Sequence, residues 1–192
     1  ELKNFLQEKK LINEKWNALN ILIQNASTVG ALDFKIFDGK QNNFEFFNNI
    51  KNNKFKILYL LNSDNLKFNK NDEFIIYQGS HGDRGAEIAD VILPSAAYTE
   101  ENGLYQNLEG RVQECRKASY PAGDSLESWK ILNKLAKNYK NKNLFDSFKV
   151  LREEVFESII NFDGINKLPK YKAPSKKNNF GFINEKIFIN PI

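Results

Sequence analysis

Three short apolar runs in the middle of the chain predict buried strands. They cover residues 55–61, 73–77 and 90–94 and are rich in β-branched and aromatic residues. Continuous runs of this length are typical of strands buried on both faces, as in parallel sheets. The connections of about a dozen residues suffice for parallel crossovers with a short helical turn, such as Ala86–Ala89. Pro94 fits a strand end, because proline cannot donate to the ladder.

Helical spacing of apolar residues predicts four helices around these strands. The first helix follows a candidate N-cap at Asn13, and the second is a short surface helix within residues 38–54. The third starts at Asp124 or Ser125, with Glu127 in its first turn. The fourth carries apolar residues from Phe148 to Ile159 on one side. Their apolar positions are Trp16, Leu19, Leu22, Ile23 and Ala26; Phe44, Phe47 and Ile50; Leu126, Trp129, Leu132, Leu135, Ala136 and Tyr139; and Phe148, Leu151, Val155, Phe156 and Ile159.

These elements predict a three-layer α/β domain with a mainly parallel sheet over residues 1–162. Turn-forming residues at Asn107–Arg111, between Tyr105 and Val112, predict a tight hairpin within it. Residues 163–192 contain proline, glycine and lysine and are predicted to form an extended C-terminal arm, with a last short strand at 186–189.

Charge changes this picture at one place. The 192 residues carry 28 Lys plus Arg and 24 Asp plus Glu, and lysine and asparagine together exceed a quarter of the chain. Nucleotide bias in the coding genome explains such a composition, and a basic nucleic-acid-binding protein is the alternative. Between Asn71 and Arg116, however, there is no lysine. This window contains nine acidic residues and three arginines, so its net charge is −6 and that of the remainder is +10. We expect packing, special backbone angles or specific hydrogen bonds to fix the residues of this window.

Several classes of protein are excluded by composition. The one cysteine, Cys115, rules out a disulfide framework and any all-cysteine metal or iron–sulfur site within the chain. No run approaches the roughly 20 apolar residues that span a bilayer. The chain has no methionine and begins at Glu1 without a secretory signal, which predicts a processed protein or a piece of one.

The candidate chemistry is weak. His81, the only histidine, lies in the G-x-x-G-x-x-G loop Gly79–Gly85 after the second predicted strand, and a structural role is favoured over catalysis or metal binding. The loop matches neither the dinucleotide nor the phosphate-loop pattern, so tight turns are favoured over a bound small molecule. Cys115 is interpreted as a passive thiol, and a solvated or capping role is favoured for at least one of the acids Glu100 and Glu101. The basic stretch 167–177 favours contact with a partner protein over nucleic acid.

The window Phe74–Gln113 carries a resemblance. It reads FIIYQGSHGDRGAEIADVILPSAAYTEENGLYQNLEGRVQ. This resembles the molybdopterin-oxidoreductase-type domain, in the form found in the C-terminal half of the largest iron–sulfur subunit of respiratory complex I (NADH dehydrogenase subunit 11). The similarity covers about residues 16–139 and is thin beyond. Its structural motif residues here are Gly79, His81, Gly82, Asp83, Asp90, Pro94, Thr99, Glu100, Asn107, Glu109, Gly110 and Arg111.

The resemblance implies a non-catalytic structural part of the peripheral arm in NADH:ubiquinone electron transfer. It implies no cofactor in this chain, iron–sulfur clusters on a complementary chain of the same split subunit, other peripheral-arm subunits as partners, no nucleic acid, and a place on the matrix side of the mitochondrial inner membrane. A fragment of a catalytic molybdopterin enzyme such as a formate dehydrogenase is the rival. For the motif, we expect a bidentate pair between Arg111 and the carboxylate of Glu100 or Glu109.

Overall fold

The computed structural model describes residues 1–12, 18–19, 21–23, 25–26, 28–34, 36, 43–63, 68–159 and 162–168. The chain divides into two compact units, each described by itself. Unit 1 is Glu1–Lys40, Leu104–Glu114 and Val155–Pro191; unit 2 is Gln41–Gly103 and Cys115–Glu154, with Ile192. The elements are α1 (Leu2–Glu8), α2 (Thr28–Asp33), α3 (Asn43–Lys51), β1 (Ile57–Leu61), β2 (Phe74–Gly79), α4 (Arg84–Ile88), β3 (Val91–Pro94), β4 (Gly103–Gln106), β5 (Val112–Cys115), α5 (Ser128–Lys140) and α6 (Phe148–Ser158).

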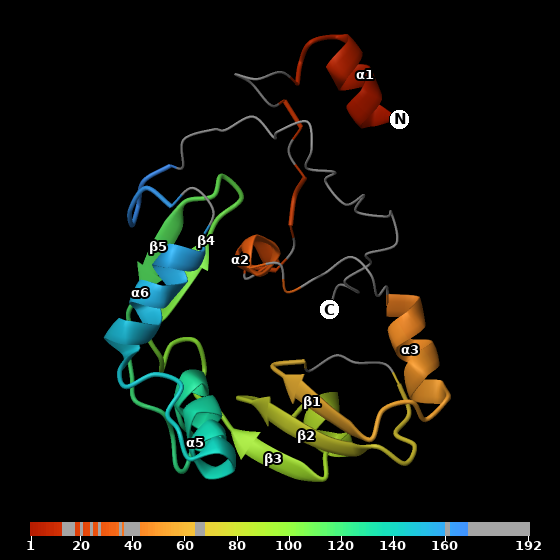
Figure 1. The fold of residues 1–192 in the computed structure, drawn as a ribbon, viewed down its shortest axis with the longest axis vertical. Coiled ribbons are helices and arrows are strands. Elements are labelled where there is room, and N and C mark those ends of the chain that lie inside the picture. Colours follow the sequence, from red (N-terminus) through yellow and green to blue (C-terminus); the bar gives the residue numbers. More distant parts are fainter. Residues whose placement is uncertain are drawn as a thin grey trace. The chain divides into compact units, whose positions relative to one another are not determined.

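Unit 2 is built on a parallel sheet of three strands in the order β1-β2-β3 (Figure 1). Leu58 pairs with Ile75 and Leu60 with Tyr77 between the first two strands, and Ile76 pairs with Val91 between the second and third. The three predicted strands, their parallel direction and the short crossover helix α4 are thereby confirmed. The fold is mixed α/β, as the apolar runs indicated.

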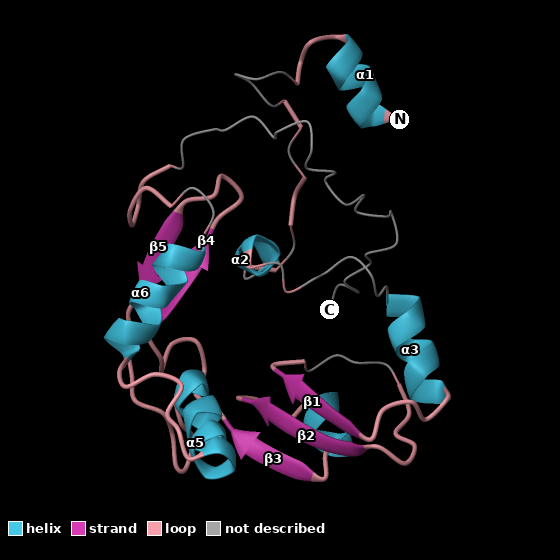
Figure 2. Cartoon of the chain, viewed as in Figure 1, coloured by secondary structure: helices cyan, strands magenta, loops and turns pink. Residues whose placement is uncertain are grey.

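One face of this sheet carries the core of unit 2. Buried side chains from both of the first two strands meet residues of α3 and α4 there, and Figure 2 shows α4 behind the sheet. The cluster consists of Ile50, Leu58, Leu60, Ile75, Tyr77 and Ile88. We call this the covered face. Its side chains alternate with residues that point to the other side, since successive strand residues face opposite ways.

The opposite face is largely exposed, which corrects the expectation of strands buried on both sides. β1 alternates between exposed and buried positions, and β2 begins with exposed Phe74. We call this the open face and define it by Ile57, Tyr59, Leu61, Phe74, Ile76 and Val91. α5 reaches only its carboxyl end, where the Gln78 amide donates to the carbonyl oxygen of Ser128. The apolar residues of a strand show that it could be buried on both faces. Within the described part of unit 2, however, no helix or strand covers this face.

The helix predicted after Asn13 is not found in the described residues. Residues 18–19, 21–23 and 25–26 have no helical structure, and α2 begins only at Thr28. Leu22 is 86% exposed and Ile21 51% exposed. Helices in proteins are stabilised mostly by packing of an apolar face, and these side chains have little to pack against. Residues 13–17, 20 and 24 of the stretch lie outside the described residues.

The predicted C-terminal arm, residues 163–192, is described only over residues 163–168. There the Asn166 amide donates to the carbonyl oxygen of Val112, at 2.8 Å. The remainder, with the short strand predicted at 186–189, lies outside the described residues, and the division at residue 162 stays a prediction. Across the described chain, no helix combines the length and the apolar character needed to cross a membrane.

Candidate functional site

The Gly79–Gly85 loop is filled by a side chain of its own strand. The Tyr77 hydroxyl donates to the carbonyl oxygen of His81 at 2.9 Å. A Cβ at Gly79 would lie 2.1 Å from that hydroxyl, and one at Gly85 would lie 2.7 Å from the ring. A side chain at either position would therefore force the tyrosine to move, because its ring and hydroxyl occupy the space. The sequence predicted tight turns here, and the structure adds that the Tyr77 side chain packs closely against the loop.

His81 and its neighbours are engaged locally. Its exposed ring lies with Nδ1 2.9 Å from the Ser80 hydroxyl. Asp83 precedes α4, and its carbonyl oxygen accepts the amides of Ala86 and Glu87. Arg84 pairs with Glu87 at 2.8 Å. Among the described residues, no three His, Cys, Asp or Glu side chains are grouped so that they could hold a metal ion.

Asp90 ties the start of β3 to β2. One carboxylate oxygen accepts the Ile75 amide at 2.8 Å, the other pairs with Lys70, and the Asp90 amide donates back to the Ile75 carbonyl oxygen. The bond from the Ile75 amide, followed by that from Lys70, lowers the pKa of this carboxyl. Asp90 thus continues the ladder with its side chain.

The segment after β3 makes a compact turn at the carboxyl edge of the sheet. Pro94 ends β3 opposite Gly79, and its carbonyl oxygen accepts the Leu126 amide. Glu100 accepts the Ala97 amide on its carboxylate at 3.1 Å. The carbonyl oxygen of Thr99 accepts the Ala118 amide at 2.8 Å. Pro94, Thr99 and Glu100 therefore hold the backbone of this turn in place.

Glu101 caps α5, a helix that the sequence did not connect with either of the two adjacent acids. Its carboxylate accepts the Ser128 amide at 2.8 Å and the Ser128 hydroxyl at 3.2 Å. The predicted start at Asp124 or Ser125 is therefore wrong: the helix begins at Ser128, and Ser125 bonds back to Ala122 in a turn. Burial raises the pKa of Glu101, and these hydrogen bonds only partly offset it.

Glu127 lies beside this cap as the centre of an ion cluster. Its buried carboxylate accepts hydrogen bonds from Lys117 and from the Trp129 indole, and Lys130 pairs with it at 3.2 Å. Burial by itself would raise its pKa, but the bonds from Lys117, Trp129 and Lys130 prevail and lower it. We call Glu101, Lys117, Glu127, Ser128 and Trp129 the α5 corner.

A short chain of polar side chains joins the sheet to this corner. The Tyr59 hydroxyl donates to the Gln78 side-chain oxygen, and the Gln78 amide donates to the Ser128 carbonyl oxygen at 3.2 Å. Gln78 is completely buried. A glutamine inside an apolar strand was a signal for such a connection. Burial raises the pKa of the Tyr59 hydroxyl, so it stays a neutral donor.

In unit 1, the hairpin predicted at Asn107–Arg111 is confirmed. β4 and β5 form a two-stranded sheet, and the Asn107 amide donates to the Arg111 carbonyl oxygen. The Asn107 side-chain oxygen accepts the amides of Glu109 and Arg111, at 3.0 and 2.9 Å. Gly110 has a φ of +83°, a conformation that favours glycine.

Arg111 has a different partner from the expected carboxylate. Its guanidinium donates to the carbonyl oxygen of Asn166 at 2.8 Å. The Glu109 carboxylate instead accepts the Asn107 amide group within the turn. The side chain of Arg111 thus reaches the first residues after α6, a chain-distant backbone group that sequence gives no means to foresee. Cys115, at the end of β5, is partly exposed, and its interpretation as a passive thiol stays a prediction.

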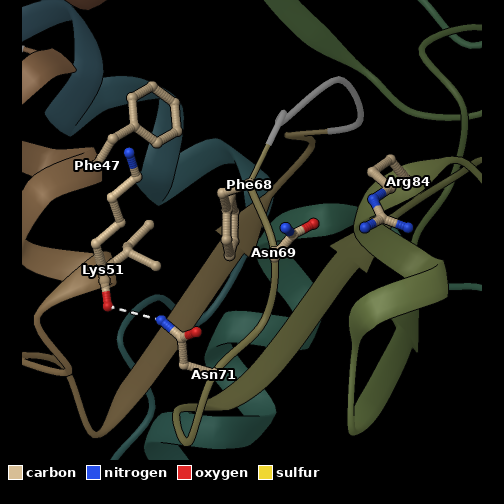
Figure 3. A pocket seen from close by; sticks show the side chains of 7 residues that line it. Phe47, Lys51, Phe68, Asn69, Asn71 and Arg84 are labelled. Atoms are coloured by element: carbon tan, nitrogen blue, oxygen red, sulfur yellow. Dashed lines mark hydrogen bonds between the residues drawn. The ribbon is translucent and has the colours of Figure 1, made fainter.

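A hollow of about 700 Å³ lies between α3 and the segment that leads into β2 (Figure 3). The rings of Phe47 and Phe68 lie on it, and the Asn71 side chain donates to the Ile50 carbonyl oxygen at its floor. Lys51, Asn69 and Arg84 complete its lining. Apart from Arg84, none of these residues belongs to the motif loops.

Comparison with known proteins decides the family. A model of the family described as molybdopterin oxidoreductase matches residues 1–138. The chain belongs to the molybdopterin oxidoreductase family. The match includes every motif residue named above, from Gly79 to Arg111.

Similar proteins of this family are much longer. The chain is 38% identical to the NADH-ubiquinone oxidoreductase 75 kDa subunit of Reclinomonas americana, over 89% of the chain and 25% of that protein. It is 35% identical to an NADH-quinone oxidoreductase subunit of Rickettsia conorii, over 100% of the chain and 27% of that protein. It is 37% identical to the mitochondrial NADH-ubiquinone oxidoreductase 78 kDa subunit of Candida albicans, over 93% of the chain and 25% of that protein. The chain thus spans about a quarter of the length of these curated relatives.

Proposed function

We propose that the chain is a non-catalytic structural part of the peripheral arm of respiratory complex I. The observation that carries the proposal is the similarity to NADH-ubiquinone and NADH-quinone oxidoreductase subunits over nearly the whole chain. In this role it complements a separate chain that carries the iron–sulfur clusters of the same subunit. Its partners are the other peripheral-arm subunits, on the matrix side of the mitochondrial inner membrane.

The hydrogen bonds of the motif support a structural role. The carboxylates of Asp90 and Glu100 accept backbone amides, as does that of the adjacent Glu101 outside the motif, and Asn107 shapes a hairpin turn. Side chains that satisfy the protein's own backbone stabilise the fold. These bonds support the proposal of a scaffold, and we propose no cofactor for this chain.

The molybdopterin family match favours one rival, a fragment of a catalytic pterin-dependent oxidoreductase. The Gly79–Gly85 loop does not fit such a group, because the Tyr77 ring fills the space beside Gly79 and Gly85 and Arg84 already pairs with Glu87. Stoichiometric molybdenum or pterin in the natively purified protein would establish the rival. We expect neither.

The experiment that tests the proposal is native separation of membrane extracts from the cells that make the chain. We expect the chain to co-migrate with NADH-oxidising activity and with an iron–sulfur chain in one large complex. Co-migration with a formate-oxidising or other molybdenum-containing assembly would contradict the proposal. Nuclease treatment of the extract should leave the co-migration unchanged, since we propose no nucleic-acid partner.

A further inference from the structure

The open face is one continuous apolar patch. Ile57 is 63% exposed, Phe74 46% and Val91 40%. The register places Ile57 beside Phe74, and Ile76 between Tyr59 and Val91, so the side chains adjoin across all three strands. Single exposed apolar residues are ordinary on protein surfaces, but contiguous patches mark interaction sites.

The polar groups on this face are already paired. Tyr59 donates to Gln78, and Gln78 donates to the first residue of α5. The residues that define the face include no charged side chain. A partner therefore finds apolar contact there, and neither phosphate groups nor acidic peptides find a cation within the patch.

We propose that the open face binds the apolar stripe of an amphipathic helix from the iron–sulfur-carrying chain, an inference that rests on the proposed function. Parallel sheets are normally covered by helices on both faces. α3 and α4 cover one face of this sheet, whereas α5 begins only over the carboxyl end of the other. About three quarters of the length of the relatives lies outside these residues and is available to complete the layer.

A helix fits better than a second copy of this chain. Two sheets pack face to face at about 10 Å, which is also about the diameter of a helix. Because α5 begins at the end of the open face, it hinders the close approach of a second sheet. A helix beside α5 continues the existing layer at the usual spacing of about 8–10 Å between axes.

Photo-crosslinking tests this contact directly. Phe74 of the full chain is replaced by benzoylphenylalanine in the cells that make it, the sample is irradiated, and the attached peptide is sequenced by mass spectrometry. Tyr139 on α5, which is 86% exposed, carries the same group as the matched control. We expect Phe74 to capture a helical segment of the iron–sulfur-carrying chain. A second copy of this chain, or residues 169–192 of the chain itself, captured at Phe74 would overturn the inference.

The outcomes separate this inference from the proposed function. If the chain co-migrates with complex I but Phe74 captures no segment of the iron–sulfur-carrying chain, the inference fails and the function stands. If Phe74 captures a protein outside complex I, both fail. As an independent readout, the pair Ile57→Ser and Phe74→Ser should lower recovery of the iron–sulfur-carrying chain at least tenfold while the melting curve of the purified chain stays cooperative. Tyr139→Ser should leave recovery unchanged, and equal recovery with both variants would overturn the inference.

Discussion

The two faces of the sheet in unit 2 are made of similar residues but stand in different surroundings. Ile75 on the covered face is completely buried among residues of α3, α4 and β1, whereas Ile57 on the open face is 63% exposed. Both belong to apolar runs of the kind found in parallel sheets. The covered face is a core built from residues of unit 2, and the open face is apolar surface that the described part of unit 2 leaves uncovered.

The motif residues and the residues of the open face differ in the same way. Asp90 and Glu100 of the motif, together with the adjacent Glu101, bind backbone amides around the sheet edge and at the start of α5, so they hold the fold. The residues of the open face have few such ties, since only Tyr59 is linked through Gln78 to α5. Substitutions on the covered face and in the motif should therefore change stability, and those on the open face should change assembly.

The largest effect is expected on the covered face. Ile75→Ala removes a completely buried side chain and should lower the free energy of unfolding by about 2–5 kcal/mol. Urea denaturation of the purified chain, followed by circular dichroism, measures it. Ile57→Ala, the same substitution on the open face, is the control. Equal losses at the two positions would show that the faces do not differ as described.

Crowding around Tyr77 gives the next effect. Gly85→Ala places a Cβ 2.7 Å from the Tyr77 ring and 2.9 Å from the Ser63 carbonyl oxygen, and should cost about 1–3 kcal/mol. Gly82→Ala is the matched control, because a Cβ there meets nothing within 4 Å. The same denaturation experiment compares them. If Gly85→Ala proved as stable as Gly82→Ala, the packing of Tyr77 against the loop would be incorrect.

The ion cluster of the α5 corner should give an acid-labile contribution of about 1 kcal/mol. Hydrogen bonds lower the pKa of Glu127 in the folded chain, so its contribution is present above the usual value of 4.5 and is lost as the pH falls through the lowered value. Burial raises the pKa of Glu101, so its ionisation opposes stability as the pH rises through that value.

Denaturation midpoints at pH 7 and pH 3.5 test this assignment. Glu127→Gln should lose stability at pH 7 and show a weaker decline into acid than the natural chain. Glu101→Gln should make the decline of stability into acid steeper, because it removes a contribution that grows as the pH falls. An acid decline that is unchanged in Glu127→Gln would mean that other groups govern it.

The smallest effect on the isolated chain is expected on the open face. Ile57→Ala should change the free energy of unfolding by about 0.5 kcal/mol or less, since the side chain is mostly exposed. Its effect should appear as weaker recovery of the iron–sulfur-carrying chain from native extracts. A loss of several kcal/mol in the purified chain would show that Ile57 is covered by this chain itself.

Much of the secondary structure was predictable because its signals are local. Apolar runs located β1, β2 and β3, helical spacing located α3 and α6, and the turn residues located the hairpin at Asn107–Arg111. Contacts between chain-distant residues were not predictable. Glu101 caps a helix 27 positions away, and Arg111 binds the carbonyl oxygen of Asn166.

The sequence pattern also could not predict which apolar side chains are exposed. An apolar run shows that a strand can be buried, but not whether the covering element belongs to the same chain. The open face was therefore predicted as buried, and the stretch around Leu22 as a helix. In both places the residues have the right periodicity, but within the described part of the chain their side chains are largely exposed.

The most direct test of a structural role is electron transfer per assembled complex in an Arg111→Lys variant. Lysine lacks the planar guanidinium that donates to the carbonyl oxygen of Asn166. The contact between the hairpin and the residues after α6 should therefore weaken. We predict less assembled complex I and an unchanged NADH:ubiquinone turnover for each complex that does assemble. Full assembly with lost electron transfer would contradict the account.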